Sequence, residues 1–222
     1  MIYLKYLLNS TIIPLEFMNK LSYAIDGLFP TPIYRSYLDR DFSKKELKLI
    51  DNQSNVLEKN TGNLLTQDKY LFKRPEFKKL KKELMQHVEK YSKVILGLKD
   101  SELYITQAWL NFTSENQFHH IHAHPNSLVA GILYINADVE KDNITFFQGG
   151  YTRIKPSVKE YHLFNSTSWT YSVKTKDILM FPSELSHKVK NKKGPNKRIS
   201  LAFNCFIKGQ LGHTNHVNEL LL

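Results

Sequence analysis

Cysteine is scarce in this chain of 222 residues, and its scarcity excludes two kinds of site. The single cysteine, Cys205, cannot form an internal disulfide, and one thiolate cannot build a cysteine zinc cluster. Any bound metal must therefore be held by nitrogen and oxygen ligands. A chain with one cysteine also suits a reducing compartment, and we expect a cytoplasmic protein.

Arginine is scarce as well, supplying only five of the 31 basic residues, although the formal net charge is +10. A basic chain can neutralise phosphates, so nucleic acid is a possible partner. An excess of Lys, Asn and Ile is also what an AT-rich genome produces, and we do not favour this partner. The apolar residues 1–15 are interrupted by Lys5 and Pro14 and are too short to span a bilayer, so no membrane is expected as a partner.

Histidine, by contrast, is concentrated in one segment. Four of the nine histidines, His119, His120, His122 and His124, fall within six residues, and His187 follows much later. If the segment is a strand, its side chains alternate between two faces, which places residues 120, 122 and 124 on one face. Two such imidazoles can hold one cation, and His187 is the best candidate for a third ligand.

The order of predicted elements favours an antiparallel sheet with helices outside it. Apolar residues recur at helical intervals in 43–59, where Ser43 and Glu46 form a capping box, and in 75–97. Strand patterns follow at 103–112, 128–135, 177–181 and 198–207, with no helix between them. We therefore predict a mainly β protein, a double-stranded β-helix (jelly roll) with N-terminal helices packed outside the sheet.

We expect one large domain with a short extension before it. Residues 1–26 are assigned to the extension and 27–222 to the domain, which comprises a mostly helical support (27–99), the jelly-roll core (100–208) and a C-terminal tail (209–222). The polar segment 141–170 is interpreted as a long insert between strands.

Several motifs resemble one family of enzymes. They are Trp109-x-Asn111, His122-x-His124-Pro125, Gly131-Ile132-Leu133-Tyr134, Phe181-Pro182-Ser183-x-Leu185-x-His187 and Arg198-Ile199-Ser200-Leu201-Ala202-Phe203-Asn204. Together they resemble a family of 2-oxoglutarate- and iron(II)-dependent oxygenases common in marine phages and bacteria. The resemblance runs from about residue 27 to residue 206. If a phage encodes the protein, the expected location is the cytoplasm of the host cell.

The resemblance implies the cofactors iron(II) and 2-oxoglutarate, the cosubstrate O2, and a role for each motif. His122, His124 and His187 would be the catalytic metal ligands, which leave positions open for the 2-oxo acid and O2. Arg198 and Ser200 would hold the distal carboxylate of 2-oxoglutarate, because Arg offers two planar, permanently charged donors.

Asn111 and Tyr134 are further candidates for binding 2-oxoglutarate. Each also has a structural reading, since an asparagine can cap a strand hydrogen bond and a buried tyrosine is commonly part of a core. The activity implied is a hydroxylase-like dioxygenase that converts 2-oxoglutarate to succinate while it oxidises a C–H bond.

The ligand set leaves alternatives open, because His124 stands where the wider superfamily has an acidic residue. The two metal ligands from this segment could instead be His120 and His122. Alternatively, a carboxylate from the insert could be the remaining metal ligand, with Asp138, Glu140 and Asp142 as candidates. With His122, His124 and His187 as the ligands, which we prefer, the surplus His119 or His120 would contact the ligands or the substrate. Lys188, Lys190 and Lys192 alternate after His187 and form either a basic rim or the solvated lysines of an edge strand.

Two rival functions fit the same residues. One is a three-histidine, cupin-like dioxygenase that binds its substrate directly and needs no 2-oxo acid, with Arg198 gripping a carboxylate of that substrate. The other is a metal-stabilised jelly-roll binding module without turnover, since a fold alone does not assign a function. The sequence does not define the substrate, which could be a protein side chain, a nucleobase or a small metabolite, nor does it define the oligomeric state.

Overall fold

The computed structural model describes residues 24–150, 154 and 156–222 of the chain. Contacts divide the chain into two units, Met1–Pro30 and Thr31–Leu222, and the fold described below is that of the second unit. Most of the expected N-terminal extension, residues 1–23, lies outside the described residues. Among the described residues, no helix is both long and apolar enough to cross a membrane.

Helix α1 (Lys44–Gln53) begins where the sequence predicts and ends earlier. The capping box is present: the Ser43 hydroxyl accepts from the backbone N–H of Glu46, and the Glu46 carboxylate accepts from the backbone N–H of Ser43. The prediction of a helix as far as residue 59 is wrong, because Ser54 and Asn55 donate side-chain hydrogen bonds to the carbonyl of Asp51 and end the helix. Strand β2 (Leu57–Lys59) follows.

The second predicted helix is confirmed over 75–97. A 3-10 turn (Pro75–Phe77) leads into α2 (Lys78–Tyr91), and a π-helical turn (Ser92–Leu96) follows it. Gly97 ends the segment in the left-handed conformation, with φ of 64°. Such a C-terminal glycine avoids the steric cost that a Cβ atom would bring.

An antiparallel sheet, which we call the main sheet, forms the centre of the domain. Its strand order is β1-β9-β6-β11-β4-β3-β2, and β12 pairs with the far end of β11. The strands not yet defined are β1 (Tyr34–Tyr37), β3 (Leu64–Thr66), β4 (Ser101–Thr113), β6 (Val129–Asn136), β9 (Asp177–Pro182), β11 (Arg198–Leu211) and β12 (Leu220–Leu221). All four strands predicted from the sequence lie in this sheet.

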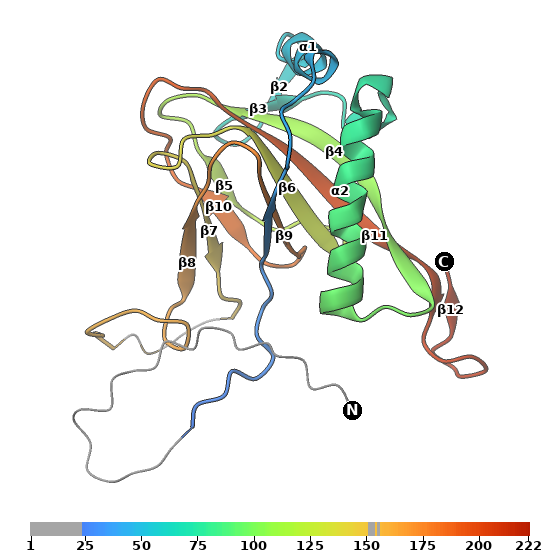
Figure 1. Cartoon of the computed structure of the whole chain (residues 1–222). Helices are drawn as coiled ribbons and strands as arrows, with labels where there is room; N and C mark the ends of the chain where they lie inside the picture. Colours follow the sequence, from blue (N-terminus) through green and yellow to red (C-terminus); the bar gives the residue numbers. More distant parts are fainter. Residues whose placement is uncertain (1–23, 151–153, 155) are drawn as a thin grey trace. The chain divides into compact units, whose positions relative to one another are not determined.

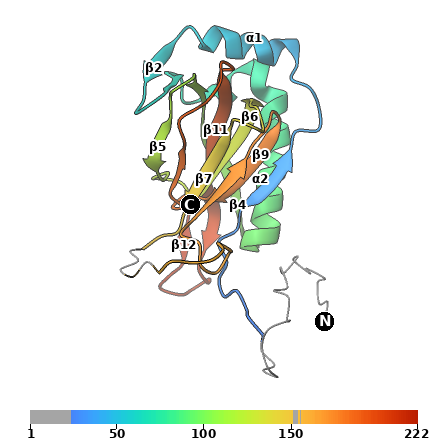
Figure 2. The same cartoon turned by 90° about the vertical axis from the view of Figure 1, so that its left-hand side faces the viewer.

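A second sheet of four antiparallel strands faces the main sheet. Its order is β5-β10-β7-β8, with β5 (His119–His122), β10 (His187–Val189), β7 (Asn143–Phe147) and β8 (Ser168–Ser172). The interpretation of 141–170 as one insert is therefore wrong at both ends, since the insert is limited to 148–167. Figures 1 and 2 show α2 on one side of the main sheet and the second sheet on the other.

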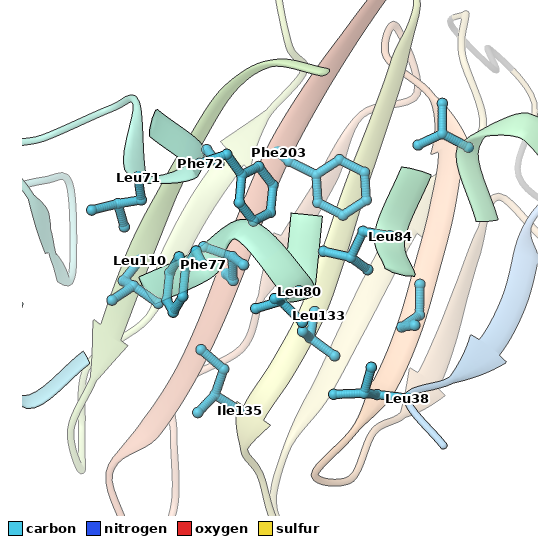
Figure 3. Packing of buried hydrophobic residues seen from close by; sticks show 14 of the residues in the cluster. Leu38, Leu71, Phe72, Phe77, Leu80, Leu84, Leu110, Leu133, Ile135 and Phe203 are labelled. Atoms are coloured by element: carbon cyan, nitrogen blue, oxygen red, sulfur yellow. The ribbon is translucent and has the colours of Figure 1, made fainter. Parts of the chain in front are cut away.

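The main sheet has a core on each face because its strands alternate. On the helix side, Leu110 of β4 and Leu133 of β6 meet Leu80 and Leu84 of α2, and all four side chains are fully buried (Figure 3). Between the two sheets, a smaller cluster contains Ala130, Tyr134, Ile144, Phe146, Val173, Leu179 and Phe181. The predicted jelly roll with helices outside the sheet is confirmed, and the candidate site lies beside this smaller core.

Candidate metal and cosubstrate site

Three histidines from two parts of the chain meet between the sheets. His122 ends β5 and stands opposite His187, the first residue of β10, in the antiparallel register. His124 lies two residues beyond β5, where its backbone N–H donates to the carbonyl of Ser183 at 2.8 Å. One ring nitrogen from each of the three lies within 4.8 Å of the others, close enough for a shared ion.

The prediction of one regular strand through residues 120, 122 and 124 is wrong in its extent and regularity, although His122 does lie near both His120 and His124. Strand β5 ends at His122, and its register against β10 shifts between the pairs His187–His122 and Val189–His119. At this irregularity the side chain of His119 turns toward His122, and their rings stack with centroids 4.2 Å apart. A bulge of this kind redirects side chains that regular pleating would separate.

Each of the three converging imidazoles is oriented through its Nδ1 atom. Nδ1 of His122 lies 2.9 Å from the carbonyl oxygen of His120, and Nδ1 of His187 lies 3.0 Å from that of Leu185. Carbonyl oxygens only accept, so both Nδ1 atoms must carry the proton. Nδ1 of His124 lies 2.8 Å from Oδ1 of Asn204, which requires the same tautomer. The three Nε2 atoms are therefore left with their lone pairs available.

The electrostatics of this group fit a cation. Nε2 of His124 and Nε2 of His187 face each other at 3.4 Å, and with both protons on Nδ1 no hydrogen bond joins them. Burial, together with the charge that His122 would carry, lowers the pKa of His124 to about 4 and that of His187 to about 3. Burial also lowers the pKa of His122. All three imidazoles are neutral at neutral pH, which is the form that binds metals.

The acidic candidates from the insert lie elsewhere. Asp142 is buried and pairs with the equally buried Lys192 at 3.4 Å, and Asp138 pairs with Lys141 at 3.1 Å. Among the described residues, none of the possible metal-binding groups near His122 includes a carboxylate. Both interpretations of Lys192, a basic rim and a solvated edge lysine, are wrong, because Lys192 is 2% exposed.

The candidate residues for 2-oxoglutarate line a small chamber behind the histidines. Arg198 and Ser200 lie two residues apart on β11 and so share one face of the strand, and Asn111 on β4 stands opposite Ser200 in the register. Together with Tyr134 of β6, they line a cavity of about 30 Å3 that His122, His124 and His187 also line. The structure thus brings together every residue that the resemblance marked.

Arg198 is a buried cation without a direct counter-ion. It is 2% exposed, its one hydrogen bond donates from Nη1 to the carbonyl of Asn143 at 3.3 Å, and its Nε has no partner. Burial lowers the pKa of Arg198, while the charges of Tyr134 and Asp142 act in the opposite direction. Among the described residues no carboxylate lies within 4 Å of its guanidinium. An anionic ligand would therefore offset the free-energy cost of burying this unpaired charge.

An outer cleft opens on the other side of the histidines. It has a volume of about 630 Å3, and Trp109, His119, His122 and His124 line both this cleft and the inner chamber. The histidines therefore stand between a small inner chamber and a larger open cleft. Such an arrangement separates a small bound cosubstrate from a larger substrate.

The sequence prediction gave no role to two residues that orient the site. Asn204 holds the ring of His124, and its own amide donates to Oε1 of Gln107 at 3.2 Å. The signal was available in the sequence, because Asn204 stands six residues after Arg198 and a strand returns to the same face every second residue.

Comparison with known proteins supports an iron and 2-oxoglutarate site. A family model described as "Putative 2OG-Fe(II) oxygenase" matches residues 107–204, which carry all the site residues discussed above. No curated protein sequence matches the chain.

Solved structures show the same fold at low identity. HygX from Streptomyces hygroscopicus, solved with nickel, 2-oxoglutarate and hygromycin B bound, is 13% identical, with a TM-score of 0.55 over 79% of this chain and 82% of its own. A prolyl-4-hydroxylase from Pseudomonas putida is 13% identical, with a TM-score of 0.52 over 79% of this chain and 92% of its own. These structures show the fold alone, and it is the family match over residues 107–204 that points to an oxidoreductase using iron(II) and 2-oxoglutarate.

Proposed function

We propose that the protein is a 2-oxoglutarate- and iron(II)-dependent dioxygenase that hydroxylates a C–H bond of its substrate. The proposal depends on one observation: three imidazoles that could bind a metal ion lie next to a buried arginine that could bind a carboxylate. Three imidazole Nε2 atoms converge without a shared proton, and a buried guanidinium without a counter-ion lies in the adjoining chamber. A metal ion can bind the three Nε2 atoms. A dicarboxylate can then bind the metal ion at one end and the guanidinium of Arg198 at the other.

The residues present suit these cofactors. His122, His124 and His187 would hold the metal through Nε2, and Arg198 with Ser200 would hold the distal carboxylate. When bound, iron(II) and 2-oxoglutarate would activate O2: the oxidative decarboxylation of 2-oxoglutarate to succinate and carbon dioxide supplies two of the four electrons that reduce O2, and the substrate supplies the other two. The protein itself orients the ligands, keeps the imidazoles neutral and shields the chamber from water.

The ligand set explains why a dianion fits. Three neutral imidazoles leave a divalent ion at its full charge of +2, whereas a carboxylate ligand would reduce it to +1. With the charge of Arg198 nearby, the centre carries three positive charges and no anion in contact with them. The dianion 2-oxoglutarate removes two of these charges, and this charge balance favours it over a monocarboxylate.

The substrate is proposed to enter through the outer cleft. In the part of the chain that the structure describes, no Asp or Glu lines this cleft, whose polar lining consists of amide, hydroxyl, imidazole and Lys69 groups beside the aromatic rings of Tyr70 and Trp109. This lining suits a neutral or anionic polar substrate better than a cationic one. A protein side chain, a nucleobase and a small metabolite all remain within this description.

The decisive experiment loads the protein with iron(II) under anaerobic conditions and adds 2-oxoglutarate. We expect a weak charge-transfer band in the visible spectrum and formation of succinate after admission of air. Succinate-free consumption of O2 would indicate the rival three-histidine dioxygenase, which needs no 2-oxo acid. Stoichiometric metal binding with neither the band nor 2-oxoglutarate binding by calorimetry would indicate a non-catalytic module.

A further inference from the structure

A second group of three histidines lies beside the proposed iron centre. His119, His120 and His122 each offer a ring nitrogen within 4.8 Å of the other two. Their ring centroids are 4.2, 5.0 and 5.2 Å apart, similar to the distances of 4.3 and 5.2 Å in the first group. All three line the outer cleft, so an ion from solution can reach them.

An amide relay can prepare His119 to be a ligand. The Asn60 side-chain amide lies 3.0 Å from Nε2 of His119 and 3.0 Å from the side-chain amide of Asn63. Asn63 is 3% exposed, and its Nδ2 has no partner in the orientation recorded. If both amides rotate by half a turn, Asn63 donates to Asn60, and Oδ1 of Asn60 accepts from Nε2–H of His119.

This rotated relay has two advantages. The unpaired buried group becomes a carbonyl oxygen, which proteins leave unpaired more often than an N–H. Nδ1 of His119 also loses its proton in this arrangement, so its lone pair becomes available to a metal ion. His120 contributes similarly, because its Nδ1 lies 3.4 Å from the carbonyl oxygen of Thr61 and its Nε2 remains available.

His122 belongs to both groups and can serve only one at a time. Its Nδ1–H donates to the carbonyl of His120, so Nε2 is its single available lone pair. We propose that His119, His120 and His122 form a second divalent-cation site, suited to zinc, that competes with the iron centre for His122. Three imidazoles and water are a common zinc ligand set. The competition rests on the proposed function, whereas the second site stands on its own residues.

The proposal has a specific consequence for inhibition. Zinc bound at the second group would remove His122 from the iron centre without occupying the position of iron. Iron held by only His124 and His187 would be bound weakly and lost. Zinc inhibition would therefore depend on His119 and His120, which are not ligands of the iron centre.

The test measures zinc binding to the full chain by calorimetry, without 2-oxoglutarate or O2. The double variant His124→Gln/His187→Gln retains only the second group. We expect the unaltered protein and this variant each to bind one zinc ion, and we expect binding to be lost when His119→Gln and His120→Gln are added. Two ions on the unaltered protein would overturn the competition, and no zinc on the double variant would overturn the second site. Thermal unfolding verifies that each variant is folded.

A single variant keeps the proposal testable if the multiple variants do not fold. In His120→Gln, about tenfold more zinc should be needed to abolish the charge-transfer band of the iron and 2-oxoglutarate complex. An unchanged zinc concentration would contradict the proposal. If the unaltered protein shows no such band but the double variant still binds zinc, the proposed oxygenase function fails while the second site stands.

Discussion

His124 and Asn204, which are 80 residues apart, are joined by a buried hydrogen bond of 2.8 Å between Nδ1 and Oδ1. The amide thereby fixes both the tautomer and the direction of the imidazole. Gln107 in turn accepts from the Asn204 amide nitrogen, so neither end of that amide is left unpaired. The position of His124, a proposed metal ligand in a loop, is thus set by two neighbouring strands of the main sheet.

Removing this hydrogen bond should weaken metal binding. Asn204→Leu lets the His124 ring rotate, and we expect its affinity for iron(II) to fall about 10- to 100-fold, as is typical when a partner of a ligating histidine is lost. Asn204→Asp retains an acceptor and should stay close to the unaltered protein. Anaerobic calorimetry measures both, with Asn136→Leu on the exposed end of β6 as the control. Equal affinities for Asn204→Leu and this control would refute the role of Asn204.

Arg198→Gln should weaken the binding of 2-oxoglutarate more than that of the metal. The variant removes a buried cation, and charge-assisted hydrogen bonds contribute about 1.5–3 kcal/mol, so we expect the Kd for 2-oxoglutarate to rise about 10- to 150-fold. Iron affinity should change little, since Arg198 donates to no ligating histidine. Arg35→Gln, on the far edge strand β1, is the matched control. A parallel loss of metal and 2-oxoglutarate binding would point instead to a collapse of the chamber.

The ion pair between Arg40 and Glu46 should make stability depend on pH. Burial alone would raise the pKa of Glu46, but hydrogen bonds from Arg40 and Ser43 more than offset this and lower it. The folded carboxylate thus binds protons less readily than the unfolded one, whose pKa is about 4.5. Its stabilising contribution is present at neutral pH and is lost as the pH falls below that value.

Glu46→Gln isolates this contribution. The amide can keep the capping box with Ser43 but loses the charge, and we expect a loss of about 1.5–3 kcal/mol at pH 7. The difference from the unaltered protein should shrink as urea unfolding is repeated toward pH 3. A difference that stays constant across this range would show that the charge of Glu46 is not responsible.

Gly131→Ala should destabilise the fold, because a Cβ atom at Gly131 would lie 2.0 Å from the buried ring of Phe203. Overpacking of this kind costs about 1–3 kcal/mol. Gly149→Ala is the control, because its Cβ atom would meet no described residue within 4 Å. Urea unfolding compares the two, and Phe203→Leu combined with Gly131→Ala should recover part of the loss. Equal stability of the two alanine variants would contradict the predicted clash.

The sequence was most informative where a pattern is long. The strands β4, β6, β9 and β11 and helix α2 each repeat their apolar residues over several turns or pleats, so their type and approximate limits followed from periodicity. The gathering of His122, His124 and His187 with Arg198 was also predicted, because the motifs that contain them resemble those of a known family.

The sequence was least informative where tertiary contacts override local preference. Strands β7 and β8 are only five residues long each, and their pairing, not their composition, separates them from the polar insert. The irregular register that stacks His119 on His122 and the burial of Lys192 against Asp142 depend on neighbouring strands and loops. No periodicity along a single segment encodes such contacts.

Strand β11 carries Arg198 and Ser200 toward the chamber and Asn204, the support of His124, on the same face. At about 3.3 Å per residue, roughly 13 Å of backbone separates Ser200 from Asn204, and hydrogen bonds to β4 and β6 on both sides prevent it from stretching. A ligand held between the histidines and Arg198 would therefore meet two anchoring points whose separation the hydrogen-bonded sheet keeps constant.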